Sequence, residues 1–485
     1  IENFEKYVFN YEESMAANPM LTLTGGAASM RLDAIEAHGT VTETPTKLVH
    51  NAAGLTIADY DNKPKSILNA DGTRETNLDV KKTGTLLTDI VRYSSYSFKG
   101  STESTTNNGN TWGGHSSAGN TTAENSVTIT GGNHTDIYGG WTTGTGSAAA
   151  ADALGNSTSN KVTVNGSAAV SGTVYGGFTD VANGKATRNE VTVDKAITGS
   201  VVGGQSAGDA TGNTVTVNAN AGAITGGKSA SGEATGNSVT VGNGTVSGNV
   251  VGGDGTTTNK NIVSLAQANV TGSVTGGSGT TANENTVNID RTNVTGTITG
   301  GAADGTGNTL NVAGTNTAAN IGGFQKVAFN TNGVAANGTV LNLTGGAQTK
   351  VDWKTLTVEG NGIGITLLNN NAGIDFGGTY TDGAVKSGLS TDRKSEINVS
   401  VVKDGSLYKQ IQYAGSQFTG VTQTSVVDGA AYGGISKAGN STHANAITVS
   451  GDYTNVYGGH TSGTSTTDVE KKNSYNNAVT ISGGT

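Results

Sequence analysis

The stretch that decides the fold runs from residue 210 to residue 241 and reads ATGNTVTVNANAGAITGGKSASGEATGNSVTV. The phrase Ala-Thr-Gly-Asn begins at Ala210 and again at Ala234, 24 residues later, and a short alternation of Val with Thr follows each time. Alternation of apolar and polar residues is typical of a half-buried strand, because successive side chains of a strand point to opposite faces. The stretch therefore indicates a repeated unit that contains a short strand.

Two alternating phrases carry this repeat along the middle of the chain. The first is the strand phrase Asn-x-Val/Ile/Leu-x-Val/Ile/Leu, with its asparagines at Asn125, Asn160, Asn189, Asn213, Asn237, Asn261, Asn285 and Asn308. The second ends in a glycine pair, at Gly139-Gly140, Gly176-Gly177, Gly203-Gly204, Gly226-Gly227, Gly252-Gly253, Gly276-Gly277 and Gly300-Gly301. A fixed period in this range is the signature of a solenoid, in which each repeat stacks on its neighbours.

We therefore predict an all-β fold, a parallel and right-handed β-helix or β-solenoid with rungs of about 24 residues and irregular excursions. Stacking places Val215, Val239, Val263 and Val287 in one inward column, and Val217, Val241, Leu265 and Ile289 in the next. Thr216, Thr240, Ser264 and Asn288 then face outward. A β-propeller fits less well, because its blades need four longer strands.

Glycine and asparagine have separate expected roles in each rung. We expect the glycine pairs at corners that need a positive φ or have no room for a Cβ. The asparagine before each strand tolerates a left-handed φ, and its amide can form a ladder along the stack.

A second and much longer repeat has an offset of 320 residues. Phe4-Glu5-Lys6 is echoed by Phe324-Gln325-Lys326, and Leu21–Ala27 by Leu341–Ala347. Trp112-Gly113-Gly114 is likewise echoed by Tyr432-Gly433-Gly434. The predicted organisation is an irregular β module at 1–105, regular rungs at 106–321, a second copy of the module at 322–425 and truncated rungs at 426–485.

Composition excludes several classes of function. The 485 residues include 76 Gly and no Cys, and the net charge is −9. No basic cluster provides the electrostatic footprint of a nucleic-acid-binding protein, and no long apolar run predicts a membrane span. The absence of Cys excludes disulfides and thiolate metal sites. Because the chain opens without Met and ends within a repeat, we expect it to be an excerpt from a longer or processed protein.

The search for catalytic chemistry yields no candidate. Gly204-Gln205-Ser206-Ala207-Gly208 matches the hydrolase nucleophile elbow, but it lies in a Gly-rich corner where no helix is expected. The six histidines, His38, His50, His115, His134, His443 and His460, have no metal-ligand spacing, and those near glycine pairs are expected to be exposed. The carboxylates of the central rungs form no column. We predict no enzyme, no catalytic, cofactor-binding or metal-binding residue, and no cofactor.

Aromatic and irregular segments are the places where recognition is expected. Tyr138, Tyr175 and Tyr457 recur at one corner of the rungs, where they either stack on each other or offer an aromatic strip to a glycan. The irregular residues near 47–100 and 366–420 hold much of the charge. Segments such as Tyr60–Lys65 are predicted excursions, and solenoids usually carry their binding function in loops of this kind.

The Val-Tyr-Gly-Gly phrase at Val174–Gly177 and Val456–Gly459 alternates with Asn-x-Val-Thr-Val/Ile, as at Asn125–Ile129 and Asn477–Ile481. This combination resembles passenger regions of large Gram-negative (type V) autotransporter adhesins. The resemblance implies export through a C-terminal translocator barrel, which this sequence does not contain, and exposure at the cell surface. Passenger proteases carry Gly-Thr-Ser-x-Ala, and Gly463–Thr467 lacks the final Ala.

Three functional hypotheses follow. The first is an extracellular adhesin, a rigid stalk whose loops bind an unknown surface receptor or glycan on host or bacterial surfaces; it would touch a membrane only through the missing translocator. The alternative is an extracellular fibre or surface-layer protein that self-associates end to end. The second alternative is a polysaccharide-active enzyme on a β-helix.

Overall fold

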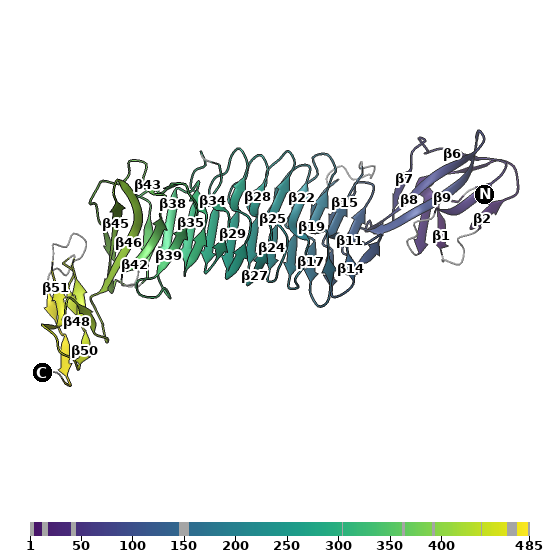
Figure 1. Ribbon diagram of the computed structural model, residues 1–485. Helices are drawn as coiled ribbons and strands as arrows, with labels where there is room; N and C mark the ends of the chain where they lie inside the picture. The colour runs from purple at the N-terminus through teal and green to yellow at the C-terminus, as the bar shows by residue number, and fades with distance from the viewer. Residues whose placement is uncertain are drawn as a thin grey trace. The chain divides into compact units, whose positions relative to one another are not determined.

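The chain folds as stacked β structure. The computed structural model describes residues 4–11, 18–39, 45–144, 155–302, 304–360, 364–389, 393–437, 439–462 and 473–483. As predicted, parallel coils form a β-solenoid, with about 17 turns and rungs of about 25 residues (Figure 1). Contacts divide the chain into two compact units: 1–247 with 251–261 and 277–281, and 248–250 with 262–276 and 282–485. The coil's hand and the four domain boundaries stay predictions.

In the first unit, the regular rungs contribute strands to three parallel ladders. One ladder contains β11 (Asn110–Ser116), β15 (Ile137–Thr142), β19 (Thr173–Thr179), β22 (Ser200–Ser206) and β25 (Ile224–Ser229). The second contains β13 (Ser126–Ile129), β17 (Lys161–Val164), β21 (Glu190–Val193), β24 (Thr214–Val217) and β26 (Ser238–Val241). The third is formed by the short strands β12 (Thr122–Ala123), β16 (Ser157–Thr158), β20 (Ala186–Thr187) and β23 (Ala210–Thr211).

The second unit is also built from parallel ladders. One ladder contains β29 (Ile262–Ala266), β32 (Thr286–Asp290), β35 (Thr309–Ala313), β38 (Lys326–Asn330) and β41 (Thr357–Glu359). Another contains β30 (Ala268–Val270), β33 (Asn293–Val294), β36 (Asn316–Ala318), β39 (Thr339–Leu343) and β42 (Ile365–Asn370). Further along, β48 (Ala430–Ser436) pairs with β51 (Val456–Thr461), β49 (Thr442–His443) with β52 (Ser474–Tyr475), and β50 (Ala446–Val449) with β53 (Ala478–Ile481).

The predicted apolar columns form the core. Val215 aligns with Val239 in the first unit, and Val263 with Val287 in the second. All eight predicted inward residues are 0–2% exposed. The residues between them point outward, as predicted, and are half-buried or exposed. A rung is thin, so a column of Val and Ile fills it without larger side chains.

The predicted asparagine ladder is confirmed. In each step, Nδ2 of one asparagine donates to Oδ1 of the asparagine in the next rung. The steps are Asn125 to Asn160 (2.7 Å), Asn160 to Asn189 (3.0 Å), Asn189 to Asn213 (3.0 Å), Asn213 to Asn237 (3.0 Å) and Asn237 to Asn261 (3.1 Å) in the first unit, and Asn285 to Asn308 (3.2 Å) and Asn445 to Asn477 (2.7 Å) in the second. The same Oδ1 accepts the donor residue's own backbone N–H, as for Asn189 and Asn213 (3.0 Å). Buried amides are thereby satisfied rung by rung.

The expected left-handed φ of these asparagines is wrong by one residue. The positive φ belongs to the residue before the asparagine, which is Glu124 (56°), Arg188 (55°), Gly212 (66°) or Lys260 (57°) in different rungs. That residue makes the corner, and the asparagine after it is free to turn its amide into the stack.

The expected position of the glycine pairs is also wrong, although the steric reason is confirmed. Six of the seven pairs lie within strands, for example in β15, β19 and β22, whereas Gly300-Gly301 follows the end of a strand; none of their φ values is positive. A Cβ on Gly204 would lie 2.6 Å from Oδ1 of Asn213, and one on Gly253 would lie 2.7 Å from Nδ2 of Asn261. The amide ladder occupies the space that a side chain at the second glycine would need.

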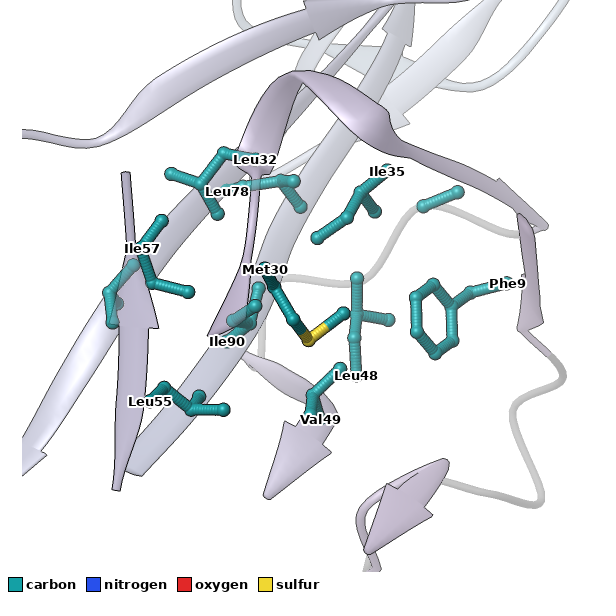
Figure 2. Close-up of a cluster of buried hydrophobic side chains, with 12 residues drawn as sticks. Phe9, Met30, Leu32, Ile35, Leu48, Val49, Leu55, Ile57, Leu78 and Ile90 are labelled. Atoms are coloured by element: carbon teal, nitrogen blue, oxygen red, sulfur yellow. The ribbon is translucent and has the colours of Figure 1, made fainter. Parts of the chain in front are cut away.

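The first irregular module has a core of its own. The short strands β1 (Tyr7–Tyr11), β3 (Ala28–Met30), β4 (Ile35–Gly39) and β6 (Leu55–Ile57) pair in parallel, and the turn η2 (Leu32–Ala34) lies among them. β2 (Leu21–Leu23) and β5 (Thr46–Asn51) continue into an antiparallel sheet with β7 (Lys65–Leu68) and the long hairpin β8 (Arg74–Thr83) and β9 (Leu86–Ser97). Leu32, Leu48, Leu78 and Ile90 are completely buried in this cluster (Figure 2).

The long hairpin recurs in the second copy. β45 (Ser395–Asp404) and β46 (Leu407–Gln417) pair as β8 and β9 do, so that Glu396 faces Ser416 where Glu75 faces Tyr96. β10 (Thr105–Asn107) folds onto β11, and β47 (Ser425–Val427) folds onto β48 in the same register.

A buried glutamate fixes each hairpin to the rung that follows it. Glu75 is 0% exposed and accepts hydrogen bonds from Ser116 Oγ (2.6 Å), the Ser117 backbone N–H (2.7 Å) and Asn120 Nδ2 (2.6 Å). Glu396 is equally buried and accepts hydrogen bonds from Ser436 Oγ (2.8 Å), the Lys437 backbone N–H (2.6 Å) and Asn440 Nδ2 (3.2 Å). Several donors for one carboxylate are the usual condition for burying its charge.

Candidate binding surface

The residues that matched catalytic patterns have structural partners. Ser206 ends strand β22, is 3% exposed, and donates through Oγ to the backbone oxygen of Gly208 (2.9 Å). The chain then turns into the next rung, so the strand-to-helix geometry of a nucleophile elbow does not form here. Gly463–Thr467 lies outside the described residues.

The histidines are dispersed over both units. His50 contacts Asp89 (2.8 Å), and His134 contacts Thr111 Oγ1 (2.7 Å) and the Gly131 backbone oxygen (2.9 Å). In the described ranges, no three His, Cys, Asp or Glu side chains group closely enough to hold a metal ion.

Two ion pairs join neighbouring regular rungs. Lys161 lies 3.0 Å from Glu190, and Lys185 lies 2.8 Å from Asp209. The hydrogen bond from Lys185 holds the pKa of Asp209 below its ordinary value. Exposed pairs of this kind contribute little to stability.

The most distinctive side-chain cluster of the first unit is an aromatic ladder, formed by Trp112, His115, Tyr138, Trp141, Tyr175 and Phe178. These residues lie in the interior of β11, β15 and β19 rather than at a corner, which corrects the prediction for Tyr138 and Tyr175. Trp112 aligns with Tyr138, and Tyr138 with Tyr175, while His115, Trp141 and Phe178 form the parallel column. The next rungs continue the two columns with Val202 and Gln205, so the ladder covers three rungs.

Four rings of this ladder form one continuous stack. His115 stacks on Trp141 (4.3 Å between centroids, 10°), Trp141 on Tyr138 (4.7 Å, 10°) and Tyr138 on Tyr175 (5.0 Å, 7°). Trp141 and Tyr138 therefore have a ring against each face. A sugar binds an aromatic residue through its ring face, so mutual stacking is favoured over the glycan strip. The second unit has a smaller version, in which Tyr457 stacks on Tyr432 (5.0 Å, 10°).

Stacking also explains why the expected exposure of His115 is wrong. The ring is 7% exposed, because Tyr96 from β9 covers it at 4.4 Å and Trp141 covers its other side. Burial lowers the pKa of His115 to about 3, so the ring is neutral at pH 7.

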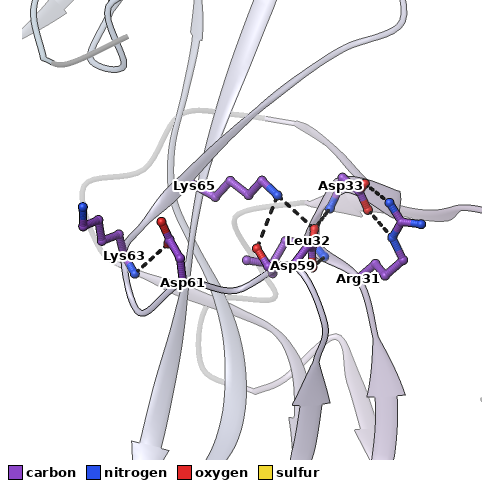
Figure 3. Close-up of polar contacts among 7 residues, drawn as sticks. All are labelled: Arg31, Leu32, Asp33, Asp59, Asp61, Lys63 and Lys65. Carbon is purple, nitrogen blue, oxygen red and sulfur yellow. Dashed lines mark hydrogen bonds and ion pairs between the residues drawn. The ribbon is translucent and has the colours of Figure 1, made fainter. Parts of the chain in front are cut away.

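The excursion at Tyr60–Lys65 is anchored by Asp59. Its carboxylate accepts the backbone N–H groups of Leu32 and Asp33 (both 2.8 Å) and contacts Lys65 Nζ at 3.0 Å (Figure 3). Burial raises the pKa of Asp59, but these three donors outweigh burial and leave it below the ordinary value. The cluster holds η2 against the loop and has a structural explanation without a ligand.

Comparison with protein-family models, curated proteins and solved structures finds no match for this chain. Among the described residues there is also no helix of the length and hydropathy that a membrane crossing requires.

Proposed function

We propose that this chain is a structural segment of an extracellular adhesin, of the kind found in autotransporter passengers, which carries binding loops on a stiff solenoid at the cell surface. The observation that carries the proposal is the unbroken internal order within each unit. Apolar columns and the buried amide ladder continue from rung to rung, and ion pairs such as Lys185–Asp209 join neighbouring rungs on the outside. A stack held together in this way resists local opening. This property suits a rigid stalk better than a reaction centre.

The sequence supports the same proposal. The Val-Tyr-Gly-Gly and Asn-x-Val-Thr phrases are those of the resemblance, and a chain without Cys can cross an outer membrane without forming disulfides on the way. The receptor is proposed to be a protein or glycan on another surface, bound by the irregular modules.

Labelling of intact producing cells tests the location. We expect an antibody against the regular rungs to label unpermeabilised cells, and external protease to remove the label. Labelling only after permeabilisation would contradict the proposal. Beads coated with the purified chain should then adhere to host cells, to bacteria or to immobilised polysaccharides more than beads coated with an unrelated β protein.

Two measurements address the alternatives. Negative-stain microscopy of the purified chain should give discrete particles; filaments that grow with concentration would make self-assembly part of its role. Incubation with a panel of polysaccharides should release no reducing or unsaturated ends, and turnover of any of them would replace the adhesin with an enzyme.

A further inference from the structure

Within the long hairpin, the first copy of the irregular module has an aromatic ring at a position where the second copy has none. In the first copy, Tyr96 of β9 lies opposite Glu75 in the hairpin and packs its ring edge-on to Trp112 (6.0 Å, 82°) and against His115 (4.4 Å). In the second copy, the residue opposite Glu396 is Ser416. The phenol ring has been replaced by a hydroxymethyl group.

The residues that the ring would contact have counterparts at the same register positions of the second copy. Trp112 and His115 occupy the same register positions in β11 as Tyr432 and Ile435 occupy in β48. Tyr432, like Trp112, is aromatic. Ile435, which stands where the first copy has His115, is apolar and 8% exposed. In both copies, a buried glutamate also joins the hairpin to the following rung beside this position.

Where Tyr96 lies in the first copy, the second copy has a cleft of about 540 Å³. Ser416 and Ile435 line it, together with backbone at Gly433 and polar side chains that include Asn398, Gln423 and Lys437. The volume lies within the usual range of about 300–1,000 Å³ for small-ligand sites. A phenol ring fills only part of this space, so the cleft can also hold the atoms attached to the ring.

We propose that this cleft is a binding site for a phenolic ring, which takes the place that the Tyr96 ring holds in the first copy. The ring packs on Ile435, and the polar rim hydrogen-bonds to the groups attached to it. The ligand is either a free phenol or a tyrosine side chain of another protein. This site is additional to the adhesin role and does not depend on it.

The probe is p-cresol, the side chain of tyrosine, titrated into the full chain and followed by saturation-transfer NMR and calorimetry. We expect one saturable site. Ser416→Tyr fills the cleft from within, and should weaken binding at least tenfold. Thr240→Tyr, on an exposed strand face of the regular rungs, is the matched control and should leave binding unchanged.

A converse variant keeps the test independent of how Ser416→Tyr folds. Tyr96→Ser removes the native ring from the first copy and should raise the stoichiometry from one site to two. N-acetyltyrosinamide and a Gly-Tyr-Gly peptide distinguish the sources: at least tenfold tighter binding of the peptide than of p-cresol indicates a tyrosine of a partner, and equal or weaker binding indicates a free phenol. Absence of saturable p-cresol binding to the unmodified chain, or unchanged binding in Ser416→Tyr with native hydrogen exchange, would overturn the proposal.

Discussion

The asparagine ladder makes a quantitative prediction at Asn213. Its Nδ2 donates to Asn237 Oδ1 and to the Ala186 backbone oxygen, and its Oδ1 accepts from the backbone N–H and the Nδ2 of Asn189, all four at 3.0 Å. Asn213→Ala removes these four hydrogen bonds inside a 0% exposed site. At about 1 kcal/mol for each net hydrogen bond, and more for each group left unsatisfied, the loss is about 4 kcal/mol.

Hydrogen exchange followed by mass spectrometry is the appropriate assay, because a solenoid opens locally rather than all at once. Peptides that cover residues 185–241 should lose protection in Asn213→Ala, and the midpoint of urea unfolding should fall. Thr240→Ala on an exposed face should change stability by less than about 0.5 kcal/mol. A loss below about 1 kcal/mol for Asn213→Ala would refute the view that the ladder stabilises the stack.

Gly203 and Gly204, which lie beside Asn213, provide a second test of the ladder. Gly204→Ala directs its new Cβ at the Asn213 amide, so combining it with Asn213→Ala should cost less than the sum of the single variants. Gly203→Ala directs its Cβ mainly at the backbone oxygen of Gly226, and truncating Asn213 should not rescue it. Simple additivity in both pairs would contradict the steric account of the glycine pair.

Three further predictions concern the first unit. Glu75→Ala removes the acceptor of four hydrogen bonds and should cost about 3 kcal/mol or more, with exchange increased in peptides covering residues 110–123 and a smaller effect for Glu75→Gln. The pKa of His115 is about 3 in the folded state and about 6.5 when unfolded, so its contribution to stability is complete above pH 6.5 and is lost as the pH falls toward 3. His115→Phe should therefore reduce the stability difference between pH 7 and pH 5 by about 2 kcal/mol; an unchanged difference in urea titrations would show that the ring is not buried. Tyr175→Ala should destabilise β19 by about 2–3 kcal/mol in urea unfolding, whereas Tyr175→Phe, which keeps the stacked ring, should cost less than 1 kcal/mol.

The regular rungs were predictable because each rung supplies the same local signals. The recurrence of Val215 at Val239 indicates a strand, the face of it that is buried and its register with the next rung. The recurring asparagine predicts the amide ladder. The glycine pairs were misplaced because sequence alone does not distinguish a glycine that needs a positive φ from one beside a neighbouring amide. The left-handed residue was missed since its identity varies between Glu124, Arg188 and Gly212.

The module contacts were less predictable because they join residues far apart in sequence. Glu75 reaches Ser116 across 41 positions, outside any rung period. A signal was nevertheless present: Glu75 and Glu396 recur at an offset of 321, beside the 320-residue repeat. The buried state of His115 depends on Trp141, which the repeat places beside it in the next rung, and on Tyr96, which no periodic pattern places against it.

The amide ladder also has a genetic consequence. Residues 213–236 form one complete rung, and removing them would bring Asn237 to the position of Asn213, with Ser238–Val241 in place of Thr214–Val217. Asn189 would then hydrogen-bond to the amide of Asn237 as it now does to that of Asn213. In the apolar column, Val191 would pack on Val239 in place of Val215. Unequal recombination between the gene segments that encode ATGN at Ala210 and Ala234 would delete or add such a rung. The length of the solenoid can therefore change in whole turns while every buried contact type is preserved.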